Sequence, residues 1–184
     1  AGQAANDIGL QCGGWTIEWQ GQPGPITPGT TLLDAIKHTL SEASHLHYDV
    51  NGDFSADISP AEVGLVVLSE QPYAEGEGDR ADLHLPEADI ALIERVRPHC
   101  QKLVVILYSG RPLIITDQLA RCDAFVAAWL PGTEGQGLAD VLFGDYPFTG
   151  KLPYTWPRSM EQIPHAALTC SNDDPLFPFG YGLA

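Results

Sequence analysis

A short acidic stretch is the first segment whose residue types could do chemistry. Residues 70–79 (EQPYAEGEGD) place four carboxylates within ten residues, and two glycines separate the last three. Crowded carboxylates raise one another's pKa, because a second negative charge nearby is disfavoured, and a carboxyl group that stays protonated can donate a proton. Glycines let the backbone swing such a group toward a ligand. The alternatives are a solvated acidic loop or a calcium site, although the spacing is not that of an EF-hand.

A second candidate segment carries two tryptophans four residues apart. Residues 12–21 (CGGWTIEWQG) hold Trp15 and Trp19 between glycines, and neither indole belongs to an apolar periodic run. Indole faces stack on the apolar faces of sugar rings and anchor many other ligands. Both are candidate substrate-binding residues; of the two, Trp19 is favoured for the ligand and Trp15 for packing, with the reverse assignment left open. Glu18, between them, is interpreted as a surface acid.

Two further loops are weaker candidates. Arg111, in the sequence SGRP at 109–112, could bind a carboxylate ligand, but we expect it to pair with one of the many acids of this chain. Residues 130–137 (LPGTEGQG) resemble a helix N-terminus with Thr133 as its cap. Glycine-rich helix starts can hold phosphate, but neither GxGxxG nor GxxxxGK[ST] is present. The absence of GxSxG also argues against a serine-hydrolase elbow.

Metal and cofactor sites are not indicated. The six histidines are scattered and are interpreted as surface residues, and no CxxC pair accompanies them. We expect no metal and no cofactor. The chain has four cysteines, at Cys12, Cys100, Cys122 and Cys170. Buried free thiols are favoured over disulfides, because Cys100 and Cys122 lie next to apolar runs.

Composition limits the class of partner. The chain has 184 residues and a net charge of −15, so nucleic acid and anionic membrane surfaces would repel it. No apolar run approaches the roughly 18–20 residues needed to span a bilayer. The length is that of one domain, and the negative charge is compatible with a neutral ligand.

The elements that must position these loops follow an α/β pattern. Three continuous apolar runs predict buried strands, at residues 63–68 (VGLVVL), 103–108 (LVVILY) and 124–129 (AFVAAW). Weaker strands are predicted at 46–50 and 152–156. Helices are predicted at 30–43, 86–99, 112–121 and 134–143. The last forty residues are rich in proline and aromatic residues, and we expect them to wrap the surface.

Strands alternating with helices predict one α/β domain with a mainly parallel, flavodoxin-like sheet and helices on both faces. Ligands of such sheets bind beyond the carboxyl ends of the strands. The loops 70–79, 109–112 and 130–137 all follow strands. The opening segment through Trp19 would follow a strand that lies before residue 1, so the first strand of the sheet is expected to be missing from this chain.

Five segments together resemble one family. They are CGGWTIEWQG at 12–21, EQPYAEGEGD at 70–79, SGRP at 109–112, AAWLPGTEGQGLADVLFGD at 127–145 and FTGKLPYTW at 148–156. They are similar to the C-terminal α/β sandwich domain of glycoside hydrolase family 3, above all to that of β-glucan exohydrolases. The resemblance runs over nearly the whole chain, residues 1–184.

The resemblance implies roles for particular residues. Glu75, in the sequence PYAE, would be the catalytic acid/base of a retaining exo-acting β-glucosidase, and Trp19 would stack on a sugar beside the reacting one. In the family an N-terminal (β/α)8 barrel supplies an aspartate nucleophile and most contacts to the bound glucose. Gly76 and Gly78 depart from the bulkier residues of the related loops, which bears on the rigidity of this loop. The implied substrate is a β-glucan oligosaccharide, and the implied location is periplasmic or secreted.

The barrel is missing from these 184 residues. We therefore expect the chain to be a fragment or one chain of a split enzyme, inactive and unstable without its partner. Two rival functions stay open. A non-catalytic carbohydrate-binding module would need the tryptophans but not Glu75, and a flavodoxin-like phosphate or nucleotide binder rests on the fold alone.

Overall fold

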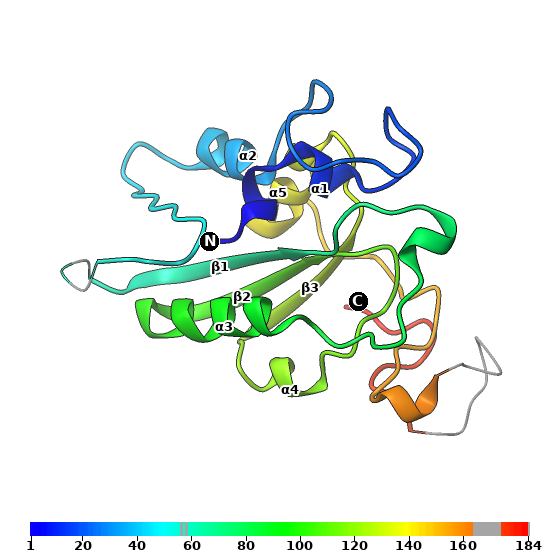
Figure 1. Ribbon diagram of the computed structural model, residues 1–184. Coiled ribbons are helices and arrows are strands. Elements are labelled where there is room, and N and C mark those ends of the chain that lie inside the picture. The colour runs from blue at the N-terminus through cyan, green and yellow to red at the C-terminus, as the bar shows by residue number, and fades with distance from the viewer. Residues whose placement is uncertain (56, 58, 164–173, 184) are drawn as a thin grey trace.

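A parallel sheet forms the centre of the domain. The computed structural model describes residues 1–55, 57, 59–163 and 174–183. Strands β1 (Ala61–Ser69), β2 (Cys100–Tyr108) and β3 (Ala124–Trp129) pair in the order β1-β2-β3, all parallel (Figure 1). Each contains the apolar run that predicted it, so the three main strand predictions are confirmed.

The first residue of the chain lies beside β1. The amino group of Ala1 donates to the carbonyl of Leu65 at 2.7 Å, and the N–H of Val67 donates to the carbonyl of Ala1 at 3.0 Å. These contacts lie on the edge of β1 that faces away from β2, because β2 occupies the other edge. A strand before residue 1 stays a prediction.

Helices cover both faces of the sheet, as predicted (Figure 1). One face carries η1 (Gln3–Asn6), α1 (Ile8–Cys12), α2 (Leu32–Thr39) and α5 (Gly135–Phe143). The other face carries α3 (Glu87–Val96), η3 (Arg97–His99) and α4 (Thr116–Leu119). The remaining short helices are η2 (Glu75–Gly78) and η4 (Met160–Gln162). The observed fold class is therefore the predicted α/β class with a parallel sheet.

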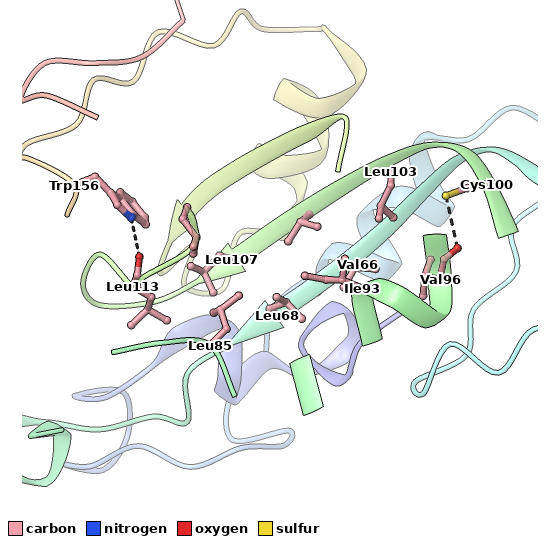
Figure 2. Close-up of a cluster of buried hydrophobic side chains, with 12 residues drawn as sticks. Val66, Leu68, Leu85, Ile93, Val96, Cys100, Leu103, Leu107, Leu113 and Trp156 are labelled. Carbon is pink, nitrogen blue, oxygen red and sulfur yellow. Dashed lines mark hydrogen bonds between the residues drawn. The ribbon is translucent and has the colours of Figure 1, made fainter. Parts of the chain in front are cut away.

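The period of two along each strand divides the core into two layers. Val66 and Leu68 point into the layer under α3, and Val67 points into the layer under α2. Figure 2 shows the layer under α3, where Trp156 from the C-terminal segment is 1% exposed. Its indole Nε1 donates to the carbonyl of Leu113 at 2.7 Å. Most of the apolar run of β2 and the end of that of β1 are buried, which explains why these strands appear in the sequence as continuous apolar runs, whereas β3 is half-buried.

Several predicted element bounds are wrong. The helix predicted at 30–43 ends at Thr39, and the helix predicted at 112–121 is only α4. Residues 113–115 are buried and not helical, and Ile114 forms a parallel bridge with His84 instead. The N–H of Ile114 donates to the carbonyl of Leu83 at 2.8 Å. A surface helix exposes one side, so three consecutive residues cannot all be buried in it. An extended segment that is covered on both sides can bury all three.

The two weak strand predictions are also wrong. Residues 46–50 form no strand, and most of their side chains are exposed, so they bury too little apolar surface to join the sheet. Residues 152–156 contribute one antiparallel bridge, between Trp156 and Phe177. Pro153 lacks an N–H and cannot extend a ladder. Among the described residues, no helix is both long enough and apolar enough to cross a membrane.

Candidate active site

Four loops gather at the carboxyl edge of the sheet. Residues 70–79 follow β1, residues 109–112 follow β2 and residues 130–134 follow β3. The tryptophan segment, residues 13–21, follows α1 and lies above the same end of the sheet, at the right of Figure 1. Parallel strands end at the same edge, and this topology brings together segments that are far apart in the sequence.

The tryptophan segment is a tight loop held at its base. Asp7 caps α1 by accepting from the N–H of Leu10 at 3.0 Å, and its side chain also accepts from the N–H of Gly24 at 2.7 Å. Within the loop, the N–H of Trp15 donates to the carbonyl of Trp19 at 2.9 Å. Trp15 and Ile17 both adopt positive φ angles, at 62° and 65°. Such angles are unusual for side chains of this size, so the loop has a backbone shape that the rest of the turn must hold in place.

Both indoles face solvent. Trp19 is 54% exposed and Trp15 is 68% exposed, and their ring centroids lie 6.3 Å apart at an angle of 55°. The packing role favoured for Trp15 is therefore not seen within this domain, and its role as a substrate contact stays a prediction. The two rings form an exposed aromatic surface, and Ile17 beside them is 72% exposed.

The acidic loop is joined to the tryptophan segment by a direct contact. The side-chain oxygen of Gln20 accepts from the N–H of Ala74 at 2.7 Å. Gly14 lies against the carbonyl of Tyr73, and a Cβ atom at Gly14 would come within 2.0 Å of that oxygen. Only glycine permits so close an approach. The backbone just before Trp15 is thus in contact with the backbone just before Glu75.

Glu75 begins the short helix η2 at the exposed tip of the acidic loop. It has φ 52°, a left-handed conformation that costs a non-glycine residue about 1 kcal/mol or more. Its neighbour Ala74 is 3% exposed, so the chain is anchored directly before it. Within the described part of the chain, the Glu75 carboxylate has no hydrogen-bond or ion-pair partner. A carboxyl group in this position is available to a ligand.

Glu70 is not part of the predicted carboxylate cluster, because it has its own cations. Its side chain is 7% exposed, and Arg111 donates to its Oε1 from Nε at 3.0 Å and from Nη2 at 2.7 Å. Tyr73 donates to its Oε2 at 3.1 Å. The prediction that Arg111 pairs with an acid is confirmed. Burial and the charge of Glu70 raise the pKa of Tyr73 to about 12.

A pocket of about 340 Å³ lies under the acidic loop. Its lining includes Glu77, Arg80, Arg111 and, from α3, Asp89. Burial raises the pKa of Asp89 to about 6, and Arg80 opposes that rise. Asp89 was not predicted from the sequence, because an acid in the first turn of a helix is ordinary. A larger hollow, of about 630 Å³, lies at the opposite, amino ends of β2 and β3, away from these loops.

The helix start after β3 is closed to phosphate. Gly135, the first residue of α5, already donates its N–H to the carbonyl of Thr30 at 2.9 Å. A Cβ atom there would lie 2.5 Å from the same oxygen, so backbone fills the space where an anion would sit. The predicted cap is also wrong, since Glu134 is the N-cap residue and Thr133 is not. This arrangement argues against a phosphate binder.

The predictions on cysteines and metals concern the rest of the domain. Cys12 and Cys100 are buried free thiols, and Cys122 is a half-buried one. Burial raises the pKa of all three thiols. Cys170 lies outside the described residues. In the part of the chain that the structure describes, no three His, Cys, Asp or Glu side chains are grouped to hold a metal ion.

Comparisons with known proteins point to one family. The model of the glycosyl hydrolase family 3 C-terminal domain matches residues 1–184. The crystal structure of an exo-1,3/1,4-β-glucanase from a Pseudoalteromonas species is similar with a TM-score of 0.87 and 36% identity, over 100% of this chain and 24% of that one. A periplasmic β-glucosidase of Salmonella typhimurium is 35% identical over 67% of this chain and 19% of its own length. A lysosomal β-glucosidase of Dictyostelium discoideum is 28% identical over 100% of this chain and 25% of its own length. The chain thus spans a quarter or less of these three proteins.

Proposed function

The chain belongs to the glycosyl hydrolase family 3 C-terminal domains, and on that premise we propose that it supplies the acid/base and an aromatic sugar subsite to a retaining exo-acting β-glucosidase. Glu75 is the proposed acid/base, and Trp19, with Trp15 beside it, is the proposed subsite. The substrate is a β-glucan oligosaccharide that loses its terminal, non-reducing glucosyl residue.

The observation that carries this proposal is the junction between the two loops. The contact of Gln20 with Ala74 links the residue after Trp19 to the residue before Glu75 at 2.7 Å. This bond supports the proposal, because it brings the loop that carries the unpartnered carboxyl group beside the loop that carries the exposed indoles, all within the described residues. Glycoside hydrolysis needs a carboxyl group to protonate the leaving oxygen, and an indole offers a flat apolar face on which a sugar ring can stack.

The proposed mechanism has two steps. In the first, a carboxylate nucleophile attacks the anomeric carbon, the glycosidic bond breaks, and Glu75 gives its proton to the leaving oxygen. In the second, the ionised Glu75 takes a proton from water, and the water oxygen bonds to the same carbon. The covalent bond between that carbon and the nucleophile then breaks, which releases glucose and restores the nucleophile carboxylate and the protonated Glu75. In retaining enzymes the two carboxyl groups stand about 5–5.5 Å apart, and we propose that the nucleophile reaches this distance from Glu75 from outside this domain.

We propose that a (β/α)8 barrel domain provides the nucleophile and most contacts to the bound glucose. The exposure of Glu75 and of both indoles supports this, because such a surface is open to a second domain. The similarity to longer enzymes supports it as well, since the chain matches only 24% of the glucanase from Pseudoalteromonas. By the same similarity we propose β-1,3- and β-1,4-linked glucans as substrates and a periplasmic or secreted location.

A substitution of Glu75 tests the acid/base role. In the complete enzyme with its barrel, Glu75→Gln should lower kcat on an oligosaccharide by about 10²-fold or more and leave the binding of glucose in place. Glu77→Gln is the matched control, because Glu77 lies on the same turn, and its rate should change by less than about 3-fold. Equal rates for the Glu75 variant and the wild type would overturn the proposal.

The same experiment separates the alternative function. The exposed indoles alone would also suit a carbohydrate-binding module that takes no part in catalysis. In that case Trp19→Ala should abolish binding to the oligosaccharide, while Glu75→Gln should change neither binding nor turnover. A matched xyloside in the assay determines whether glucose is preferred to a sugar without the hydroxymethyl group.

A further inference from the structure

One guanidinium group contacts the acidic loop on both sides of Glu75. Arg111 lies over the ring of Tyr73, with its central carbon 4.6 Å from the ring centroid. Its Nη1 also donates to the carbonyl of Gly78 at 2.6 Å. Tyr73 lies two residues before Glu75 and Gly78 lies three residues after it. The turn that carries Glu75 therefore begins and ends against the same side chain.

Arg111 is itself held in a fixed position. Two of its nitrogens donate to the buried Oε1 of Glu70, at 2.7 and 3.0 Å. Glu70 is tied to the sheet, because its N–H donates to the carbonyl of Tyr108 at 3.0 Å. Charge-assisted bonds from two nitrogens of one arginine add geometric definition as well as energy. The sheet therefore fixes the guanidinium, and the guanidinium fixes the loop.

The packing around Tyr73 leaves little room for other arrangements. A Cβ atom at Gly78 would lie 2.2 Å from the ring, and one at Gly110 would lie 2.9 Å from the hydroxyl oxygen. Tyr73 is thus enclosed by two glycines and the guanidinium of Arg111. The same guanidinium reaches the far end of the turn through its hydrogen bond to Gly78, so it joins the two ends.

Glu75 needs such support, because its backbone is strained. A non-glycine residue at φ 52° persists only where the surroundings hold it there. The Glu75 carboxylate has no partner of its own among the described residues, so its position depends on the turn. We propose that Arg111 is the positioning residue of the acid/base: it holds Tyr73 and Gly78 so that the carboxyl group of Glu75 meets the leaving oxygen. This inference rests on the proposed function of Glu75.

The test compares substrates that need an acid with substrates that do not. A disaccharide has a poor leaving group and requires protonation, whereas a dinitrophenyl β-glucoside leaves readily without it. In the complete enzyme, Arg111→Gln should lower kcat/KM on the disaccharide by about 10²-fold and on the dinitrophenyl glucoside by less than about 5-fold. A purely structural defect would lower both rates by the same factor.

Two further variants sharpen the comparison. Arg80→Gln is the matched control: Arg80 also donates to Glu70, at 3.4 Å, but its second donor reaches the carbonyl of His84. It should change either rate by less than about 2-fold. If Arg111→Gln fails to fold, Arg111→Lys replaces it in the test, because lysine keeps a positive charge beside Glu70. An ammonium group lacks the planar fork, so this variant should show the same selective loss to a smaller degree.

The outcomes separate the two proposals. If Glu75→Gln itself shows no difference between the two substrates, the acid/base proposal fails. If the Glu75 variant shows the selective loss while both Arg111 variants lose equally on the two substrates, or lose nothing, only the positioning role of Arg111 is overturned.

Discussion

Gln20 and Ala74 are 54 residues apart in the sequence and are joined by one hydrogen bond of 2.7 Å. The side-chain oxygen of Gln20 satisfies a backbone N–H that is part of a buried residue, since Ala74 is 3% exposed. This bond connects the loop of the indoles to the loop of the proposed acid/base. Its removal would leave a buried donor without a partner.

Substitution of Gln20 should therefore impair both stability and activity. Gln20→Ala is expected to cost about 1–3 kcal/mol of unfolding free energy, because the N–H of Ala74 loses its acceptor in a buried place. Turnover should fall as well, since Glu75 directly follows Ala74. Urea denaturation and the rate on an oligosaccharide measure the two effects.

Gln22→Ala provides the control for this change. The Gln22 side chain donates to Glu18 at an exposed position of the same segment. Exposed hydrogen-bonded pairs contribute little to stability. We therefore expect Gln22→Ala to lower the unfolding free energy by less than about 0.5 kcal/mol and to leave the rate on the oligosaccharide unchanged. If the two variants were equally stable and equally active, the junction between the loops would have no functional importance.

The two glycines of the acidic loop should differ sharply in tolerance. Gly78→Ala places a Cβ atom 2.2 Å from the ring of Tyr73, whereas Gly76→Ala meets nothing within 4 Å. Overpacking of this kind costs about 1–3 kcal/mol, so the Gly78 variant should melt at a lower temperature and turn over more slowly. The Gly76 variant should match the wild type in both. Calorimetry and initial rates distinguish them, and a tolerated alanine at 78 would show that Tyr73 can move aside.

Much of the fold could be predicted from the sequence, and the reason is burial on both sides of the sheet. Continuous apolar runs such as residues 103–108 are typical of strands between two layers of helices. The bounds of α4 could not be predicted, because the N–H of Ile114 donates to the carbonyl of Leu83, a residue distant in the sequence. This bond keeps the residues before α4 out of the helix.

The candidate site was only partly predictable, for a similar reason. Residue types indicated that Arg111 would pair with an acid, but the choice of Glu70 depends on the register of β1 and β2. Ser69 pairs with Tyr108 in that register, so the side chains of the next loops meet. The exposure of Trp15 accompanies a positive φ angle, which no local pattern of this sequence indicates. The role of Gln20 could not be predicted from the sequence, because its partner is the backbone N–H of Ala74 and no residue type indicates such a contact.

The stability of the domain should depend on pH through Asp89. Burial raises its pKa in the folded state to about 6, above the usual value of about 4 for an unfolded chain. The folded state therefore binds more protons than the unfolded state between these values, and unfolding free energy should fall as pH rises from about 4 to 6. Because the side chain is partly exposed, we expect a change of about 1–2 kcal/mol.

Two variants isolate the contribution of Asp89. Asp89→Asn should remove this part of the slope, and Glu87→Gln on the same helix should keep it. Melting curves at pH 4 and pH 7 provide the measurement, and a parallel pH response of wild type and Asp89→Asn would contradict the assignment.

The exposed indoles should contribute to binding and hardly to folding. Trp19→Ala and Trp15→Ala remove side chains that are 54% and 68% exposed, so each should change unfolding free energy by less than about 1 kcal/mol. Burial of an indole face against a sugar ring is worth on the order of 1.5 kcal/mol, so the Trp19 variant should lose about 10-fold in kcat/KM on a disaccharide. An aryl glucoside with a small leaving group should be affected less.

Trp156→Ala is the converse variant. Trp156 is 1% exposed, and its Nε1 donates to the carbonyl of Leu113, so its loss should cost about 3–5 kcal/mol and lower the melting temperature sharply. Kinetics on the two substrates and thermal melts of all three variants measure these expectations. The Trp19 variant should lose activity without losing stability. If it lost as much stability as Trp156→Ala, or kept full activity on the disaccharide, the exposed indole of Trp19 would not be a sugar-binding residue.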